Sequence, residues 1–202
     1  MRLVYSRRAR LIKYGVVALL AMLFITLTAC VQSDLSVLEG DSFPHAEVLA
    51  IAKATLTGTK LAPAISGDIT LEETAAGLNM RGTFENIPAG MHGFHIHEGE
   101  SCADEGKAAG GHFNPRGVDH GHLPSSGLES AHAGDLGNLL ATATAPADWS
   151  LEIPGLTLTS GEFSVANRTF ILHADPDDLS QPTGNAGPRI ACGVIEPMAL
   201  VP

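Results

Sequence analysis

From residue 46 onward, the chain contains no long stretch with the apolar spacing and caps of a helix, which would need about 10 to 12 residues. It consists instead of short runs separated by Gly, Pro, Asn and Asp, the pattern of strands joined by turns. Alternation is clearest around Ile69 and Leu71, which fall on one face of such a run. The pattern predicts an all-β antiparallel sandwich or barrel. The expected strands are residues 46–56, 66–72, 78–84, 93–97, 161–165 and 169–173.

The composition excludes several classes of function. A length of 202 residues suits one domain with additional segments, and a hydrophobic content of 45% is ordinary for a globular protein. A formal net charge of −10 argues against a nucleic-acid partner, because phosphate binding needs clustered Lys and Arg. The 3 cysteines include no CxxC pair, so neither a disulfide scaffold nor a zinc ribbon is expected.

The first thirty residues have the pattern of an export signal. Residues 1–13 carry five basic residues and no acidic one, and an apolar run of 16 residues, 14–29, ends at Cys30. This run is shorter than the roughly 20 residues of a spanning helix, and a basic start before a short apolar run is typical of a secretory signal. The alternative is an uncleaved N-terminal anchor helix. Either interpretation places the rest of the chain outside the cytoplasm.

The end of this segment, Leu27-Thr28-Ala29-Cys30, resembles the lipobox of bacterial lipoproteins. The resemblance implies a signal peptide at residues 1–29, membrane attachment through a lipidated Cys30, a tether at 30–45 and a folded domain at 46–202.

Two neighbouring residues bear on the destination and route of this exported chain. Val31 favours the outer membrane over the inner membrane of the cell envelope, and Arg10 disfavours the twin-arginine route relative to unfolded export. Removal of the five basic residues with the signal peptide would change the formal net charge from −10 to −15.

Histidines are concentrated in one part of the chain. Seven of the 9 lie between His92 and His132, and residues 98–140 form a long Gly-rich segment with little strand character before Leu139. A connection of this length in a compact domain is normally either functional or disordered. Disorder gives no reason for the histidines, whereas a bound metal would hold such a loop in place. We therefore predict a functional, metal-binding loop.

The histidine spacing indicates which metals would bind. His95 and His97 lie two residues apart in an expected strand and so face the same side, which forms an imidazole pair suited to copper, zinc, iron or nickel. Three imidazoles and one carboxylate suit tetrahedral zinc. Candidates for that second set are His112, His120, His132 and Asp135, while His173 ends a further expected strand and would complete the first site.

Four segments together resemble the copper/zinc superoxide dismutases: HGFHIHE (92–98), GGHFNP (110–115), HAGDLGN (132–138) and GNAGPRIACGVI (184–195). The similarity extends from about residue 46 to residue 197. It implies an eight-stranded Greek-key barrel or flattened sandwich with long metal-binding and active-site loops. It also implies dismutation of superoxide to dioxygen and hydrogen peroxide, with one copper ion and one zinc ion per subunit.

The resemblance also assigns roles to individual residues. His112 would bridge both metals as an imidazolate and act in catalysis, and Arg189 would guide the anionic substrate. Asp177 would link a copper histidine to a zinc histidine, and Cys102 would form a disulfide with Cys192, which leaves no free thiol if Cys30 is lipidated. The implied copper ligands are His95, His97, His112 and His173, and the implied zinc ligands are His112, His120, His132 and Asp135.

Several alternatives remain at this point. His92 faces away from the pair at 95 and 97 and suits a structural hydrogen bond. His122 competes with His120 as a zinc ligand, although the spacing favours His120. His45 suits a solvated position. Asp177 is alternatively a turn residue.

The function and the assembly also have alternatives. A non-catalytic envelope protein that binds or delivers copper is the main rival function, and a copper-only relative is opposed by the zinc set. Neither Gln181 nor Pro182 supplies the lysine that eukaryotic relatives carry in this loop, so attraction of the substrate would depend on other residues. The oligomeric state is left open, and a homodimer is one alternative.

Overall fold

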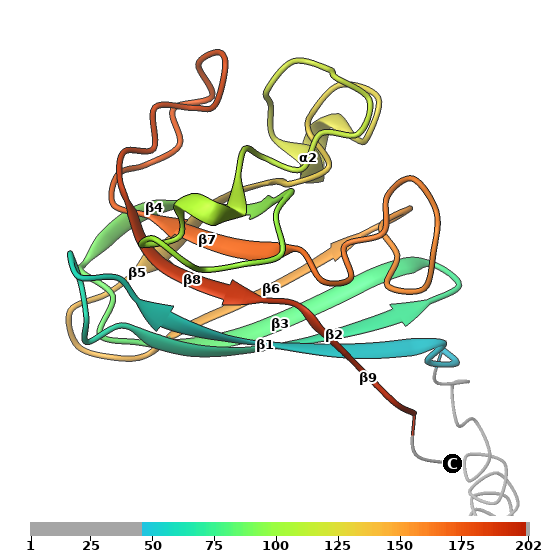
Figure 1. Ribbon diagram of the computed structural model, residues 1–202, viewed down its shortest axis with the longest axis horizontal. Coiled ribbons are helices and arrows are strands. Elements are labelled where there is room, and N and C mark those ends of the chain that lie inside the picture. Colours follow the sequence, from blue (N-terminus) through green and yellow to red (C-terminus); the bar gives the residue numbers. More distant parts are fainter. Residues whose placement is uncertain (1–45, 201–202) are drawn as a thin grey trace, which may run out of the picture. The chain divides into compact units, whose positions relative to one another are not determined.

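The computed structural model describes residues 46–200. The expected signal peptide, Cys30, the tether and His45 therefore lie outside the described residues. The described part is built from antiparallel strands with two very short helices (Figure 1). Their bounds are β1 Ala50–Gly58, β2 Ser66–Thr74, β3 Gly77–Glu85, β4 Gly90–His97, η1 Lys107–Ala109, α2 Leu123–Ser126, β5 Asp135–Ala141, β6 Ala147–Ile153, β7 Thr169–His173, β8 Arg189–Val194 and β9 Glu196–Met198.

Eight of the strands follow one hydrogen-bonded path in the order β5-β4-β7-β8-β1-β2-β3-β6, and β9 pairs with β1. Figure 1 shows β4, β7 and β8 lying above β1, β2 and β3, so the sheet curves over on itself as a nearly closed barrel. The predicted all-β architecture is confirmed. No helix among residues 46–200 is long and apolar enough to cross a membrane.

The interior of the barrel follows from the alternation of side chains along the strands. In β2 and β3, buried residues alternate with exposed ones, as expected for strands with one face in the core. Phe94 lies at the centre, stacked on Phe170 with ring centroids 5.3 Å apart and edge-on to Phe84 at 5.7 Å. Burial of each such side chain contributes about 1.5–3 kcal/mol. The apolar core therefore fixes the strands from which the histidines project.

Two expectations about the strands are wrong. Residues 161–165 form a loop rather than a strand, because their backbone groups bond within residues 157–165 and the buried Glu73 carboxylate accepts the N–H groups of Leu158 and Thr159. Strand β5 begins at Asp135, four residues before Leu139. Its first residue, the polar Asp135, is buried and pairs with His95 of β4, which the sequence pattern does not reveal.

The barrel brings the long loop to the strands that carry the first histidine pair. Strand β4 pairs with β5 on one side and with β7 on the other, so that His95 lies between Asp135 of β5 and Ile171 of β7. The loop after β4 is attached to β8 by the disulfide between Cys102 and Cys192, as predicted, across a sequence separation of 90 residues. Figure 1 shows this loop and the loop before β8 on the upper side of the barrel.

Candidate metal centre

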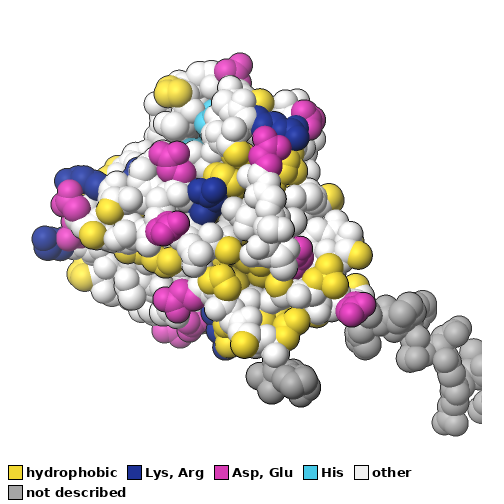
Figure 2. Space-filling view, turned by 45° about the vertical axis from the view of Figure 1, so that its right-hand side comes forward, with side chains coloured by type: hydrophobic (Ala, Val, Ile, Leu, Met, Phe, Trp, Pro, Cys, Tyr) yellow, Lys and Arg dark blue, Asp and Glu magenta, His cyan; other side chains and the backbone are white. Residues whose placement is uncertain are grey.

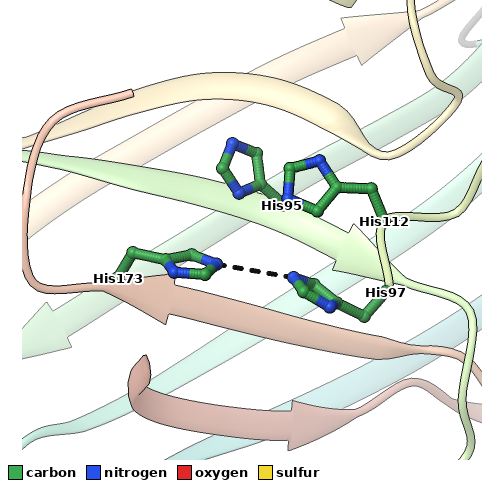
Figure 3. Close-up of side chains that lie close together, drawn as sticks. All are labelled: His95, His97, His112 and His173. Atoms are coloured by element: carbon green, nitrogen blue, oxygen red, sulfur yellow. Dashed lines mark hydrogen bonds between the residues drawn. The ribbon is translucent and has the colours of Figure 1, made fainter. Parts of the chain in front are cut away.

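One histidine cluster lies where β4 meets β7. His95 and His97 are on β4, His173 ends β7, and His112 reaches them through an isolated β-bridge to His97 (Figure 3). All four rings are buried, and each offers a nitrogen within 4.8 Å of the others. The structure therefore brings together the four histidines that the resemblance assigned to copper.

The protons on His97 and His173 are set by main-chain carbonyl groups. The Nδ1 atom of His97 lies 3.0 Å from the Gly110 oxygen, and Nδ1 of His173 lies 3.0 Å from the Gly187 oxygen. A carbonyl oxygen only accepts, so each Nδ1 carries the proton of its neutral ring. The two Nε2 atoms, joined by the dashed line in Figure 3, face one another at 3.4 Å, and neither neutral ring has a proton to donate there. Two lone pairs directed at one point suit a cation.

Burial keeps His97, His112 and His173 uncharged. Loss of solvent, reinforced by neighbouring histidines, lowers the pKa of His97 to about 2 and that of His173 to about 3. Burial likewise lowers the pKa of His112 to about 4, even though the Asp135 carboxylate acts in the opposite direction. At neutral pH these rings therefore present lone pairs rather than protons, as metal binding requires.

The second cluster surrounds the buried carboxylate of Asp135. Its Oδ1 atom lies 2.8 Å from Nδ1 of His112 and 3.0 Å from Nδ1 of His132, and its Oδ2 atom lies 2.9 Å from Nδ1 of His120. Burial alone would raise the pKa of Asp135, but the three neighbouring rings and the hydrogen bond from the Gly121 N–H hold it well below its usual range. Three imidazole nitrogens and one carboxylate converge here, the donor set of a structural zinc site.

Asp177 connects the two clusters. Its carboxylate accepts hydrogen bonds from Nε2 of His95 at 2.8 Å and from Nε2 of His120 at 3.0 Å. Burial opposes a charge on His120, but Asp135 and Asp177 together outweigh it and raise the pKa of His120 to about 9. The hydrogen bonds of Asp177 place a proton on Nε2 of each ring and leave each Nδ1 for another partner.

Those two Nδ1 atoms provide a test of whether metals fit. Both atoms are buried. Nδ1 of His95 has no hydrogen-bond partner in the described part of the chain, and Nδ1 of His120 has only a contact of 2.9 Å with Oδ2 of Asp135, which lacks hydrogen-bond geometry. An unsatisfied buried polar atom costs about 1–3 kcal/mol, so buried groups normally have partners. Each of these atoms belongs to one four-residue group with metal-binding spacing, and His112 belongs to both. A metal in each group would supply the missing partner.

An open pocket leads to the first cluster. It has a volume of about 400 Å³ and is lined by three histidines, His97, His112 and His173, and by Arg189, the single cationic residue of its lining. The guanidinium of Arg189 is fixed by hydrogen bonds to the Gly106 oxygen and, at 2.6 Å, to the Gly110 oxygen. Figure 2 shows cationic side chains scattered among acidic ones, and little histidine surface. Because Arg189 is positively charged, the pocket could admit a small anion next to the buried rings.

The other two histidines among residues 46–200, His92 and His122, lie outside both clusters. The ring nitrogens of the buried His92 are 2.9 Å from the His173 oxygen and 2.8 Å from the Pro88 oxygen. His122 precedes α2, and its Nδ1 lies 2.8 Å from the Ser125 hydroxyl. The geometry brings His120 rather than His122 to Asp135.

Two residues that hold the site were not identified from the sequence. The side-chain amides of Asn138 and Gln181 each form two hydrogen bonds with the main chain of a site residue, Asp177 and His120 respectively. The motif HAGDLGN contains Asn138, but no pattern indicated Gln181.

Comparison with known proteins agrees with this geometry. The family model for copper/zinc superoxide dismutase (SODC) matches residues 65–195. An extracellular Cu-Zn superoxide dismutase of Caenorhabditis elegans is 32% identical over 181 residues, 86% of this chain and 76% of the relative. Another from Haemonchus contortus is 40% identical over 136 residues, 64% of this chain and 72% of the relative.

A solved structure shows the same fold. The crystal structure of the clock protein EA4 superposes with a TM-score of 0.65 at 34% sequence identity, and the match covers 75% of this chain and 98% of that protein. The sequence match, the barrel and the paired histidine clusters lead to one assignment. The chain belongs to the copper/zinc superoxide dismutase family.

Proposed function

We propose that the chain catalyses the dismutation of superoxide, in which two superoxide ions and two protons give one dioxygen and one hydrogen peroxide. His95, His97, His112 and His173 would hold copper, and His112, His120, His132 and Asp135 would hold zinc. The observation that carries the proposal is the pair of facing Nε2 atoms of His97 and His173, which lie 3.4 Å apart beside an open pocket. When bound, copper supplies the one-electron chemistry that interconverts superoxide with each product.

The residues around the pocket have separate tasks. Arg189, held in place by two carbonyl groups, would attract and orient the superoxide anion through its guanidinium. His112 would bridge the two metals, with Nδ1 on the zinc side next to Asp135 and Nε2 on the copper side. Nε2 of His112 would then take up and return one of the two protons. Asp177 would keep the rings of His95 and His120 in the tautomer that directs Nδ1 to the metals.

The proposal is tested by metal analysis of the purified protein together with inhibition of superoxide-driven dye reduction. We expect one copper and one zinc per chain, and loss of activity in His95→Ala. The matched control is His122→Ala, which alters a nearby histidine outside both clusters and should keep both metals and the activity.

The rival function is a protein that binds or delivers copper without turnover. Arg189→Ala separates the two functions, because an enzyme loses rate while copper stays bound, whereas a carrier loses nothing. Full copper loading without activity in the unaltered chain would establish the carrier, and zinc alone would contradict the copper site.

We further propose that the chain is exported and lipid-anchored, with signal peptide 1–29, tether 30–45 and dismutase domain 46–202. Support for export comes from two relatives named as extracellular, and support for lipidation comes from residues 14–30 alone. A periplasmic lipoprotein of the bacterial outer membrane fits Val31. Labelled fatty acid should enter the unaltered chain but not Cys30→Ala, and cell fractionation should place the label in the outer membrane. Light scattering on the same protein tests for a homodimer.

A further inference from the structure

The short loop between β7 and β8, residues 174–188, contacts the zinc cluster through Gln181. The amide Nε2 of Gln181 donates to the His120 oxygen at 2.8 Å, and the His120 N–H donates to Oε1 of Gln181 at 3.0 Å. Within residues 46–200, these are the two hydrogen bonds of the His120 main chain. A side chain of another loop therefore replaces the pairing that a strand would give this residue.

An equivalent arrangement holds the main chain of Asp177, the residue whose carboxylate is hydrogen-bonded to the His120 ring. Nδ2 of Asn138 donates to the Asp177 oxygen at 2.9 Å, and the Asp177 N–H donates to Oδ1 of Asn138 at 2.8 Å. The side chains of His120 and Asp177 are in turn hydrogen-bonded to one another at 3.0 Å. Two amides thus hold the main chains of the two residues, one from strand β5 and one from the short loop.

Gln181 is important because His120 has little other support. The backbone from residue 114 to residue 122 lies outside all strands and helices, whereas the His95 and His97 backbones are paired with β7. The His120 ring must nevertheless direct Nδ1 toward Asp135 and Nε2 toward Asp177 at the same time. A main chain held at both its N–H and its carbonyl group restricts the ring to that orientation.

The same loop also reaches the copper side. Thr183, Asn185 and Gly187 line the pocket beside His97 and His173, and the Gly187 oxygen accepts the Nδ1 proton of His173. Displacement of the segment at Gln181 would therefore act on the zinc cluster directly and on the pocket through its neighbours.

We propose that Gln181 is a positioning residue of the zinc site. From the short loop between β7 and β8, it fixes His120 and slows the loss of zinc. The inference rests on the metal centre of the proposed function and adds a residue to it. Groups that orient a metal ligand typically change metal affinity by about 10- to 100-fold when removed. We expect that change in zinc release, whereas copper would be held by four histidines to which the Gln181 side chain makes no hydrogen bond.

The test compares Gln181→Leu with the control Ser180→Ala. Leucine keeps the bulk of the side chain but forms neither hydrogen bond with His120. Alanine at 180 removes a hydrogen bond of the neighbouring residue, from Nδ2 of Asn185 at 2.8 Å, that lies wholly within the loop. Zinc release into a colorimetric chelator and the visible spectrum of Co²⁺ bound in place of zinc are recorded for both variants and for the unaltered chain.

We expect Gln181→Leu to release zinc about 10 to 100 times faster and to shift the Co²⁺ spectrum, with copper release unchanged. Ser180→Ala should match the unaltered chain in all three measurements. If Gln181→Leu releases zinc at the unaltered rate, the inference is wrong. Should that variant fail to fold, Gln181→Met, which also lacks the amide, takes its place under the same criterion. Failure of the unaltered chain to bind zinc or Co²⁺ would instead remove the zinc site itself and this inference with it.

Discussion

The two halves of the metal centre are supported in different ways. On the copper side, three of the four ring positions come from β4 and β7, whose backbones are paired in the barrel. On the zinc side, His120 and His132 come from the long loop, and the cluster is organised around the carboxylate of Asp135. Burial keeps His97 and His173 of the copper side neutral, whereas carboxylates favour a charged His120.

This difference indicates which half depends on its surroundings. Sheet hydrogen bonds and the aromatic core place the copper-side rings before any metal binds. The zinc side is placed by side-chain hydrogen bonds and by a disulfide near the start of its loop. We therefore expect perturbations of the loop to affect zinc binding first and copper binding second.

The largest expected effect is loss of the disulfide. Replacement of both Cys102 and Cys192 by serine should lower the free energy of unfolding by about 4 to 5 kcal/mol, the chain-entropy value for a loop of this length. Urea unfolding with and without zinc measures the change. The zinc-dependent part of the stability should shrink more than the copper-dependent part. Equal losses on both sides would contradict the distinction between the two halves.

Acid should destabilise the metal-free protein through the copper side. The pKa values of His97 and His173 lie at about 2 and 3 in the folded state, below the unfolded value of 6.5. Folding excludes these protons, so the stability is complete above pH 6.5 and declines below it by about 1.4 kcal/mol per pH unit for each of the two rings, or about 2 kcal/mol per ring at pH 5. Urea unfolding of metal-free protein between pH 7 and pH 5 should show this decline, and His97→Gln should make it shallower.

The zinc side should respond to pH in the opposite direction. The pKa of His120 is raised to about 9, so its contribution to stability is complete below pH 6.5 and is lost as the pH rises through about 9. The same proton must leave when zinc binds, so zinc affinity should rise with pH over this range. Zinc titrations at pH 6, 7.5 and 9 test this, and a pH-independent affinity would show that His120 is already neutral at pH 6.

A smaller effect is expected when the link between the halves is changed. In Asp177→Asn, an NH2 group replaces one of the two carboxylate oxygens, so that one of the Nε2 atoms of His95 and His120 faces a donor instead of an acceptor. That ring would be driven to place its proton on Nδ1, which faces its metal. Zinc affinity should fall by about 10- to 100-fold. Competition with chelators measures both metals, and an unchanged copper affinity would show that His95 keeps its tautomer and that only His120 depends on this carboxylate.

The smallest effect is expected at an exposed ion pair. Arg116, in the loop between β4 and β5, pairs with Glu129 of the same loop and with Glu162 of the loop between β6 and β7. Because exposed ion pairs contribute little to stability, Arg116→Ala should barely change the unfolding free energy and should leave zinc release unaltered. A larger change in zinc release would mean that the zinc side is supported from its outer surface as well.

Residue alternation was sufficient to predict the strands whose faces are clearly divided between core and solvent. It also placed His95 and His97 on one face, because a strand turns successive side chains to opposite sides. It did not predict the start of β5, where the polar Asp135 is buried, or the loop at 161–165, whose neighbours Leu158 and Thr159 donate hydrogen bonds to Glu73 of a distant strand.

The sequence does not reveal the contacts that determine which ring nitrogen of His97 and His173 carries the proton. The carbonyl groups of Gly110 and Gly187 belong to residues without side chains, and their direction depends on the folded loops. The partnership of Gln181 with His120 spans 61 residues and joins two irregular segments. Neither kind of contact leaves a periodic or compositional pattern.

The close packing at Gly184 has a consequence for protein engineering. A methyl group at this position would lie 1.9 Å from Oδ1 of Asp177 and 2.7 Å from Nε2 of His120, and the backbone φ of +74° already favours glycine. The loop between β7 and β8 therefore packs closely against the loop that carries His120. A chimaera should exchange both loops together, because either loop grafted alone would pack against a loop of a different shape.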